Sequence, residues 1–303
     1  MNKKSAMLVT AAGILWGCIG IFVRRLSGWG LASMEIVEIR AVFAALFLLP
    51  VLLIRDRSLL KIRLKDLWIF LGTSLFSVLF FNFCYFSAIR LLSLSAAAVL
   101  LYTAPAFVMV LSFFLFHESF TGRKVAALVL TFLGCLCVSG IGGAGAGAGA
   151  GSFSMAGLLA GLGAGIGYAM YSIFGRYAIN RGYQSLTITF WTFAIASAGT
   201  LLMQPQGSLW TAVFHSPKIL GYGAGLGLFS TVLPYLFYTA GLKGMENGTA
   251  SVIASIEPVT ASLIGIILFH ETGTWQSWLG VVLVLSGIVL CSMRKSTAEE
   301  VPA

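Results

Sequence analysis

One acidic residue lies deep inside an apolar stretch, where a charge is rarely kept without a reason. Glu257 stands within Thr249–Phe269 and is followed directly by Pro258. A charged side chain at the centre of a bilayer costs about 3 kcal/mol even on insertion scales, so it is expected to have a partner or a function. Glu257 therefore either binds a proton or a substrate amine, or makes a structural contact with Arg40 or with another helix.

Aromatic residues that carry a polar atom recur in the other apolar stretches. Tyr168 and Tyr171 are three residues apart, as are Tyr235 and Tyr238, so each pair shares one face of a helix. Hydroxyls inside a membrane need partners within the protein, and aromatic faces attract amines. We predict a substrate pathway lined by Trp16, Asn82, Tyr85, Tyr102, Tyr168, Tyr171, Tyr235, Tyr238 and Glu257. The alternative is that these aromatic residues pack the interior or form an interfacial belt.

Three prolines and one arginine indicate where helices bend and where a gate could lie. Pro105 and Pro258 fall inside long apolar stretches, where proline removes a backbone hydrogen bond and bends a helix. We predict that both act as hinges, the alternative being a static bend. Pro234 is expected to break the helix Ile219–Leu242 and has no proline partner in Leu67–Ile89. Arg40 lies within Ser33–Ile54, needs a partner there, and is a candidate for an external gate.

Two histidine–glutamate pairs close apolar stretches. The pairs are His117-Glu118 and His270-Glu271. Their order differs from the His-Glu-x-x-His spacing of metalloprotease helices. We predict that Glu118 and Glu271 cap helix ends or take part in gating, and we expect no metal site and no cofactor.

The composition places these residues in a membrane. Of 303 residues, 58% are hydrophobic and 10% are charged, whereas soluble domains carry about 25% charged residues. A helix needs roughly 20 apolar residues to cross a bilayer. Ten stretches have about that length: Ala6–Val23, Ser33–Ile54, Leu67–Ile89, Leu94–Phe116, Val125–Ile141, Met155–Phe174, Ser185–Met203, Ile219–Leu242, Thr249–Phe269 and Trp275–Met293.

The basic residues predict the orientation of these stretches. The net charge of +9 comes from 19 Lys and Arg residues that stand mostly in short loops, so it indicates topology and no nucleic-acid partner. With the N-terminus in the cytoplasm, only Arg24, Arg25, Arg90 and Lys218 fall in external loops, and Arg40 falls inside a span. The positive-inside rule therefore places both termini in the cytoplasm.

The two halves of the chain repeat each other. Leu115-Phe116-His117-Glu118 recurs 153 residues later as Leu268-Phe269-His270-Glu271, and Pro105 and Pro258 have the same offset. At an offset of 152 residues, Arg24 corresponds to Arg176. Each repeat contains five predicted helices. Because five is odd, the second copy must enter the membrane from the opposite side, as in secondary transporters that work by alternating access.

The predicted fold is therefore an all-α integral membrane protein with ten transmembrane helices in two inverted five-helix repeats. The first repeat covers residues 1–141, a Gly/Ala linker covers 142–152, the second repeat covers 153–294, and residues 295–303 form a cytoplasmic tail. Residues 140–145 match G-x-G-x-x-G, but they follow a membrane span and lack the acidic residue of a dinucleotide site. We expect no nucleotide there.

Several short motifs together resemble a known family. They are Leu15-Trp16-Gly17, Arg40 with the apolar run that ends near Pro50, Pro105 with Glu118, and Glu257-Pro258 with Glu271. With the duplicated ten-helix layout, the chain resembles the EamA-like transporters of the drug/metabolite transporter superfamily across almost its whole length. The resemblance implies a plasma-membrane carrier, often an exporter of amino acids or other metabolites, with a central cavity between its halves.

The predicted function is secondary transport of small organic metabolites, chiefly amino acids or related amphipathic solutes, with export as the expected direction. A carrier of sugar phosphates or nucleotide sugars is an alternative, but it needs basic residues in the cavity, and Arg40 is the one candidate. A membrane-embedded lipid-modifying enzyme is another, but it needs a clustered acid, base or metal site. We expect no enzymatic activity. The expected partners are a small-molecule substrate, membrane lipid and a coupling proton or other ion.

Overall fold

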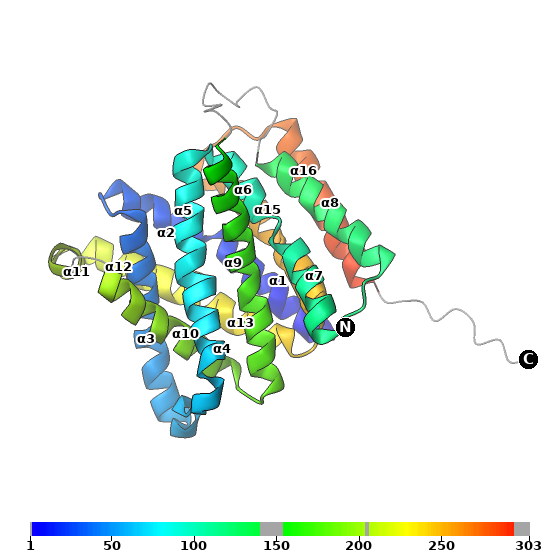
Figure 1. The fold of residues 1–303 in the computed structure, drawn as a ribbon. Coiled ribbons are helices and arrows are strands. Elements are labelled where there is room, and N and C mark those ends of the chain that lie inside the picture. The colour runs from blue at the N-terminus through cyan, green and yellow to red at the C-terminus, as the bar shows by residue number, and fades with distance from the viewer. Residues whose placement is uncertain (1, 140–153, 204–205, 294–303) are drawn as a thin grey trace, which may run out of the picture.

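The chain forms helices and no strands within the residues that the structure describes. A computed structural model describes residues 2–139, 154–203 and 206–293, which form a bundle of helices (Figure 1). The predicted linker at 142–152 and the predicted tail at 295–303 lie outside these residues. Nine helical segments of the described part are long and apolar enough to cross a membrane: Lys3–Gly28, Ser33–Arg55, Leu64–Leu91, Leu94–Phe116, Met155–Asn180, Ser185–Met203, Pro217–Leu242, Asn247–Phe269 and Trp275–Ser292. The protein is therefore a multi-pass membrane protein.

Many of these segments consist of two shorter helices in line. The first half of the chain contains α1 (Lys3–Gly17), α2 (Ile19–Gly28), α3 (Ser33–Arg55), α4 (Leu67–Leu71), α5 (Phe81–Leu91), α6 (Leu94–Leu101), α7 (Ala104–Phe116) and α8 (Gly122–Val138). The second half contains α9 (Met155–Asn180), α10 (Ser185–Met203), α11 (Gln206–His215), α12 (Pro217–Gly227), α13 (Leu233–Leu242), α14 (Asn247–Ala254), α15 (Ile256–Phe269) and α16 (Trp275–Ser292).

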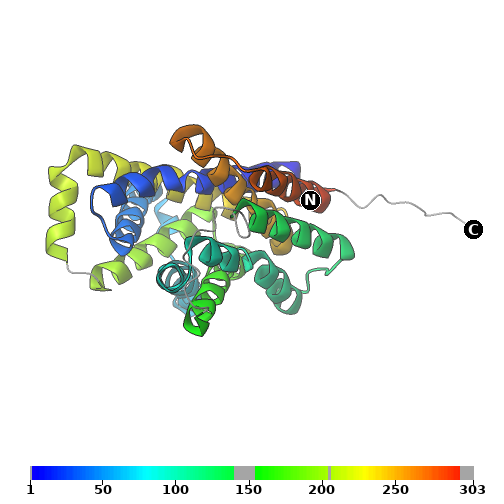
Figure 2. The same ribbon diagram turned by 90° about the horizontal axis from the view of Figure 1, so that it is seen from above.

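The predicted stretch Val125–Ile141 is absent from these nine segments and corresponds to the helix α8, which is shorter than each of them. Its 17 described residues begin after Thr121, whose hydroxyl accepts a hydrogen bond from the Lys124 amide. The helix packs along α16 over its length, and both views show the two side by side (Figure 1 and Figure 2). Glycines make this approach possible: a Cβ on Gly134 would lie 2.7 Å from the backbone nitrogen of Val284.

The helices are interrupted at positions that recur 153 residues apart. α6 gives way to α7 at Tyr102 and Thr103, and α14 gives way to α15 at Ser255. α7 and α15 both end in a left-handed histidine, His117 at φ 54° and His270 at φ 53°. The structural irregularities of the first half therefore return in the second half at the register of the sequence repeat.

Wider π-helical turns interrupt another pair of helices. They cover Gly72–Phe80 between α4 and α5, and Leu228–Val232 between α12 and α13. A π turn leaves carbonyl groups without their usual amide partners, and hydroxyls supply some of them. Ser77 donates to the Gly72 carbonyl at 3.3 Å, and Thr231 donates to the Leu226 carbonyl at 3.0 Å. Pro234 stands in the first turn of α13, directly after the second-half π turn, and the first-half turn forms without a proline partner, so the sequence did not predict it.

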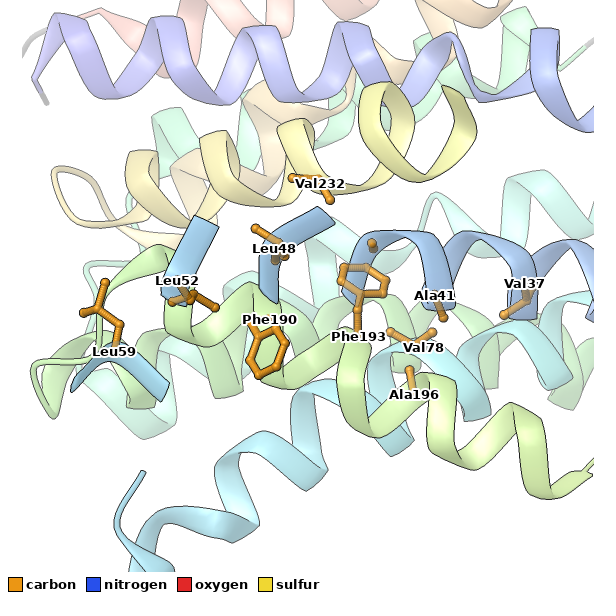
Figure 3. Close-up of a cluster of buried hydrophobic side chains, with 11 residues drawn as sticks. Val37, Ala41, Leu48, Leu52, Leu59, Val78, Phe190, Phe193, Ala196 and Val232 are labelled. Atoms are coloured by element: carbon orange, nitrogen blue, oxygen red, sulfur yellow. The ribbon is translucent and has the colours of Figure 1, made fainter. Parts of the chain in front are cut away.

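The apolar core between α3 and α10 is the largest buried cluster. Leu48, Leu52, Phe190 and Phe193 meet there, with Val232 of the second π turn above them (Figure 3). Other helix pairs also match across the repeat: α5 packs against α9, and α1 packs against α13. These contacts join the two halves of the chain into one body, and they bring α1, α9 and α13 together at its centre.

The bundle has two ends, which we call the N-face and the opposite face. The N-face holds Asn2, whose amide donates to the Gly244 carbonyl, together with Glu118 and Asn247. Cys291, near the end of α16, packs with Val252 in the turns just inside this face. The opposite face holds Arg24, Leu94 and Glu271. Both described ends of the chain therefore lie toward the same face.

Candidate functional site

The position of Glu257 depends on the interruption between α14 and α15. α14 ends at Ala254, Ser255 has φ −64° and ψ 2°, and α15 begins at Ile256. Pro258 has no N–H, and in a continuous helix its ring would clash with the Ala254 carbonyl. Glu257 thus lies in the first turn of α15, where free amides and the helix dipole favour a negative charge.

The carboxylate of Glu257 is held by an aromatic residue of a neighbouring helix. Tyr168 of α9 donates a hydrogen bond of 2.9 Å to Glu257 Oε2. Two rings from the first half pack against Tyr168: Trp16 of α1 at 6.3 Å and Phe81 of α5 at 5.7 Å between ring centroids. The two halves of the chain therefore enclose this carboxylate together.

Four of the predicted aromatic residues form one cluster with Tyr168. Trp16 lies edge-on to Tyr235 at 5.3 Å and is tilted against Tyr238 at the same distance. Tyr171 lies edge-on to Tyr235 at 4.7 Å. Edge-to-face pairs at these separations are favourable, so the cluster fixes how α1, α9 and α13 meet beside Glu257.

Two tyrosines of this cluster have hydroxyl partners away from Glu257. The Tyr171 hydroxyl lies 2.8 Å from Thr239 Oγ1, and the Tyr238 hydroxyl lies 2.7 Å from Ser172 Oγ. Both pairs are buried and join α9 to α13. Tyr171 and Tyr238 thus connect helices, whereas Tyr168 contacts the carboxylate.

A small cavity adjoins Glu257 and Tyr168. It encloses about 20 Å³, which is room for about one water molecule. Its walls come from both interrupted helices: Leu101, Tyr102, Ala104 and Pro105 from α6, α7 and the turn between them, and Ser251, Ala254, Ser255 and Pro258 from α14, α15 and the turn between them. The interruptions of the two repeats therefore meet at one place.

Arg40 of α3 reaches this region from another side. The residue is buried, lies within hydrogen-bonding reach of the Tyr235 hydroxyl, and is within electrostatic range of Glu257. Its Nε atom has no hydrogen-bond partner among the described residues. A buried guanidinium with a free N–H group is able to bind a carboxylate or another anion.

Two predicted pathway residues, Asn82 and Tyr85, lie outside the aromatic cluster around Tyr168. Asn82 is buried and donates to the Val78 carbonyl of its own helix at 2.7 Å, so it stabilises the end of the π turn. Tyr85 stacks on Phe81 at 5.9 Å and lies within electrostatic range of Glu257. Tyr85 thus flanks the site, and Asn82 supports a helix that lines it.

The two predicted gate acids lie at opposite ends of the bundle, with different partners. On the N-face, Glu118 accepts hydrogen bonds from the backbone amides of Asn247 at 2.7 Å and Gly248 at 3.1 Å. On the opposite face, Glu271 forms an ion pair of 2.5 Å with Arg24, and both side chains are about half exposed. Neither acid is near Glu257, so neither belongs to the central site.

The sequence did not reveal the polar contacts that surround Glu118. The Arg176 Nε atom donates to Asn247 Oδ1 at 2.8 Å, and its Nη2 atom bonds to the Met245 carbonyl. Arg176 has a sequence signal, because it corresponds to Arg24 in the repeat, but that correspondence does not predict its contact with Asn247. Asn247 had none, since its repeat counterpart is Leu94.

Comparison with known proteins agrees with this architecture. The model of the EamA-like transporter family matches residues 3–140 and 155–293. A protein of Archaeoglobus fulgidus, described as an uncharacterized transporter, is 27% identical over 293 residues, with 96% of each chain covered. The uncharacterized inner membrane transporter YicL of Salmonella typhimurium is 26% identical over 308 residues, with 96% of each chain covered.

A solved structure has the same fold. A chain titled "Crystal structure of protein" superposes with a TM-score of 0.77 at 17% identity, covering 96% of this chain and 97% of its own. Since the family model matches almost the whole of this chain, in both halves, the chain belongs to the EamA-like transporter family.

Proposed function

We propose that this transporter carries small organic solutes, chiefly amino acids or related amphipathic amines, out of the cell by alternating access. The observation that carries the proposal is the position of Glu257. Its carboxylate lies at a helix interruption in the middle of the protein, is bonded to Tyr168 and is surrounded by aromatic rings from both halves. A charge placed so deep needs a ligand or a proton in part of its cycle.

The chemistry of this site suits a zwitterion. Glu257 and the ring of Tyr168 offer a carboxylate and an aromatic face to an amine. Arg40 offers to a carboxylate its Nε–H group, which no described residue accepts. The cavity of about 20 Å³ is too small for such a solute, so the solute enters only when the two halves move apart. Pro105 and Pro258, beside the interruptions, act as the hinges of that movement.

The chain crosses the membrane ten times, as two inverted repeats of five helices. α8 supplies the tenth crossing. The paired interruptions, the paired π turns and the matching helix contacts of the two halves support this arrangement. The N-face, which carries most of the basic loops, is cytoplasmic, and the membrane is the plasma membrane.

Flux in proteoliposomes tests this proposal. Purified wild type and Glu257→Gln are reconstituted, and uptake of a labelled amino-acid panel is measured with and without a pH gradient. We expect one or a few amino acids to accumulate with wild type, and Glu257→Gln to abolish the gradient-driven part. Glu35→Gln serves as the control, because Glu35 caps α3 at the Ala32 amide at 2.7 Å and lies outside the site.

Two other results would change the proposal in different ways. Flux that is insensitive both to the gradient and to Glu257→Gln would make the protein a facilitator and Glu257 a structural residue. If no member of the panel moves, the amino-acid assignment is wrong, and phosphorylated sugars, which Arg40 would bind, become the next solutes to test.

A further inference from the structure

The strongest asymmetry between the two repeats lies at the ends of the interrupted helices. On the N-face, α7 of the first repeat packs against α14 of the second. No comparable packing joins their counterparts α6 and α15 among the described residues. If the repeats were in equivalent conformations, both contacts would be present, so the structure has one of the two ends closed.

The closed end is joined by Glu118. Its two carboxylate oxygens accept from the amides of Asn247 and Gly248, the first two residues of α14. Free amides and the helix dipole make this a favourable place for a carboxylate. The left-handed conformation of His117 ends α7 and turns the chain so that Glu118 follows directly. The side chain thus joins residues that are about 130 positions apart in sequence.

Asn247 strengthens this contact. Its side chain is fully buried, donates to Ser112 Oγ of α7 at 3.2 Å and accepts from Arg176 of α9. Arg176 also lies within electrostatic range of Glu118. The N-face contact therefore joins three helices, and Glu118 is its only member that binds the amides of the α14 N-terminus among the described residues.

On the opposite face, the carboxylate and the helix amides that correspond to this contact are not bonded to each other. The counterpart of Glu118 is Glu271, which follows the left-handed His270 and bonds to Arg24, the counterpart of Arg176. Its carboxylate folds back over Gly265 of its own helix. The amides that correspond to Asn247 and Gly248 are those of Leu94 and Ser95, at the start of α6, and neither has a hydrogen-bond partner among the described residues.

We propose that Glu118 and Glu271 are alternating latches: Glu118 closes the N-face in the state described, and Glu271 binds the Leu94 and Ser95 amides in the opposite state, when Glu118 is released. The proposal rests on the proposed inverted repeat and its transport cycle. The two latches differ in strength, because Leu94 has no side-chain amide to repeat the contacts of Asn247. The state with a closed N-face is therefore the resting state.

Accessibility of a single cysteine tests the latches without a substrate. Ser251 lines the cavity beside Glu257, and Ser251→Cys is made in a background whose five native cysteines are replaced. A membrane-impermeant maleimide is applied to inside-out and to right-side-out vesicles. We expect Glu118→Gln to raise the labelling rate from the N-face about tenfold or more, because a hydrogen bond to a charged group is lost. Glu271→Gln should lower that rate and raise labelling from the opposite face.

Glu35→Gln is the matched control. It also removes a carboxylate from a helix N-terminus, but one that caps its own helix, so labelling should stay at the wild-type rate. If Glu118→Gln labels like this control, Glu118 is a static cap and the latch is wrong. If Glu118→Gln does not reach the membrane, Ser112→Ala is the variant that tests the latch. It removes a hydrogen-bond partner of Asn247 and should shift labelling in the same direction. Unchanged labelling of Ser112→Ala rejects the latch.

The two proposals fail in distinguishable ways. If Glu118→Gln opens the N-face while Glu271→Gln has no effect, the latches do not alternate, even where flux is normal. If both variants shift labelling as expected but no solute of the panel moves, the amino-acid assignment fails and the latches stand.

Discussion

At the scale of single residues, the clearest feature is the different use of chemically similar side chains. Tyr168 and Tyr171 lie three residues apart on α9, and both hydroxyls are hydrogen-bonded. Tyr168 bonds to the Glu257 carboxylate, and Tyr171 bonds to Thr239. A hydrogen bond to a charged group is worth about twice one between neutral groups. The two residues therefore offer a matched pair of substitutions.

We predict that Tyr168→Phe lowers the rate of amino-acid flux about tenfold, because Glu257 loses its hydrogen-bond donor. Tyr171→Phe removes a hydroxyl of the same kind from the same helix and should change flux less than about twofold. The comparison uses initial rates at equal protein incorporation. Equal losses in both variants would mean that the Tyr168 contact with Glu257 has no special role.

The pKa of Glu246, in the loop before α14, predicts how the stability of the protein depends on pH. Partial burial opposes its charge, but the hydrogen bond and charge of Lys124 outweigh this and lower the pKa of Glu246 below 4.5. A lowered folded-state pKa stabilises the protein above the unfolded value, and this contribution is lost as the pH falls through the folded value. Because the side chain is 41% exposed, the ion pair contributes no more than about 1 kcal/mol.

The expected result is that Glu246→Gln is less stable than wild type at pH 7, by about 0.5 kcal/mol, and that this difference disappears below about pH 4. Thermal unfolding in detergent from pH 3.5 to 7.5 measures both proteins. A difference that grows as the pH falls would contradict the predicted sign.

At the scale of elements, the interruption of a helix and the close approach of two helices follow from different residues. The interruption at Ser255 follows from Pro258, and the sequence reports it. The close contact of α8 and α16 follows from small residues on both helices. A Cβ on Gly134 would lie 2.8 Å from the Gly280 carbonyl oxygen, closer than real contacts allow.

Gly134→Ala is therefore predicted to destabilise the protein by about 1–3 kcal/mol, since overpacking forces α8 away from α16. Gly122→Ala, in the first turn of the same helix, meets no atom within 4 Å and should leave the unfolding temperature unchanged. Thermal unfolding of the two variants, side by side in detergent, is the measurement. Equal unfolding temperatures would show that the α8–α16 contact adapts without cost.

At the scale of the whole molecule, the two repeats appear in different conformations. The ends of α7 and α14 are joined, whereas α6 and α15 make no comparable contact among the described residues, although the sequence relates the two pairs by one offset. Under the proposed inverted repeat, the chain has a second arrangement in which these contacts are exchanged, and the proposed transport cycle passes through both.

The proposed inverted arrangement predicts that equivalent residues lie on opposite sides of the membrane. Ser119 and Thr272 are exposed and 153 residues apart. Ser119→Cys and Thr272→Cys are made separately in a cysteine-free background, and spheroplasts are treated with an impermeant maleimide. Thr272→Cys should be labelled directly, and Ser119→Cys only after permeabilisation. Labelling of both from outside would contradict the inverted arrangement.

The sequence by itself determined the membrane class, the family resemblance and most of the spans, because the length and apolarity of a span are local properties that a bilayer demands of each helix separately. It also pointed to Glu257 and to aromatic residues that the structure brings together, since a polar atom in an apolar stretch is visible without a structure. It missed the first-half π turn and the N-face contacts of Asn247. The π turn has no composition signal, and Asn247 stands at a loop boundary.

Only the tertiary structure decided which of these residues meet. Tyr168 contacts Glu257 while Tyr171 does not, and Asn82 bonds to its own helix instead of facing the cavity. Such choices depend on how far each helix is rotated about its axis and on the packing of distant segments, which periodicity does not fix. The contact of α7 with α14 is likewise set by the packing of distant segments. The offset of 153 residues relates the two halves, and only the contacts between distant helices distinguish them.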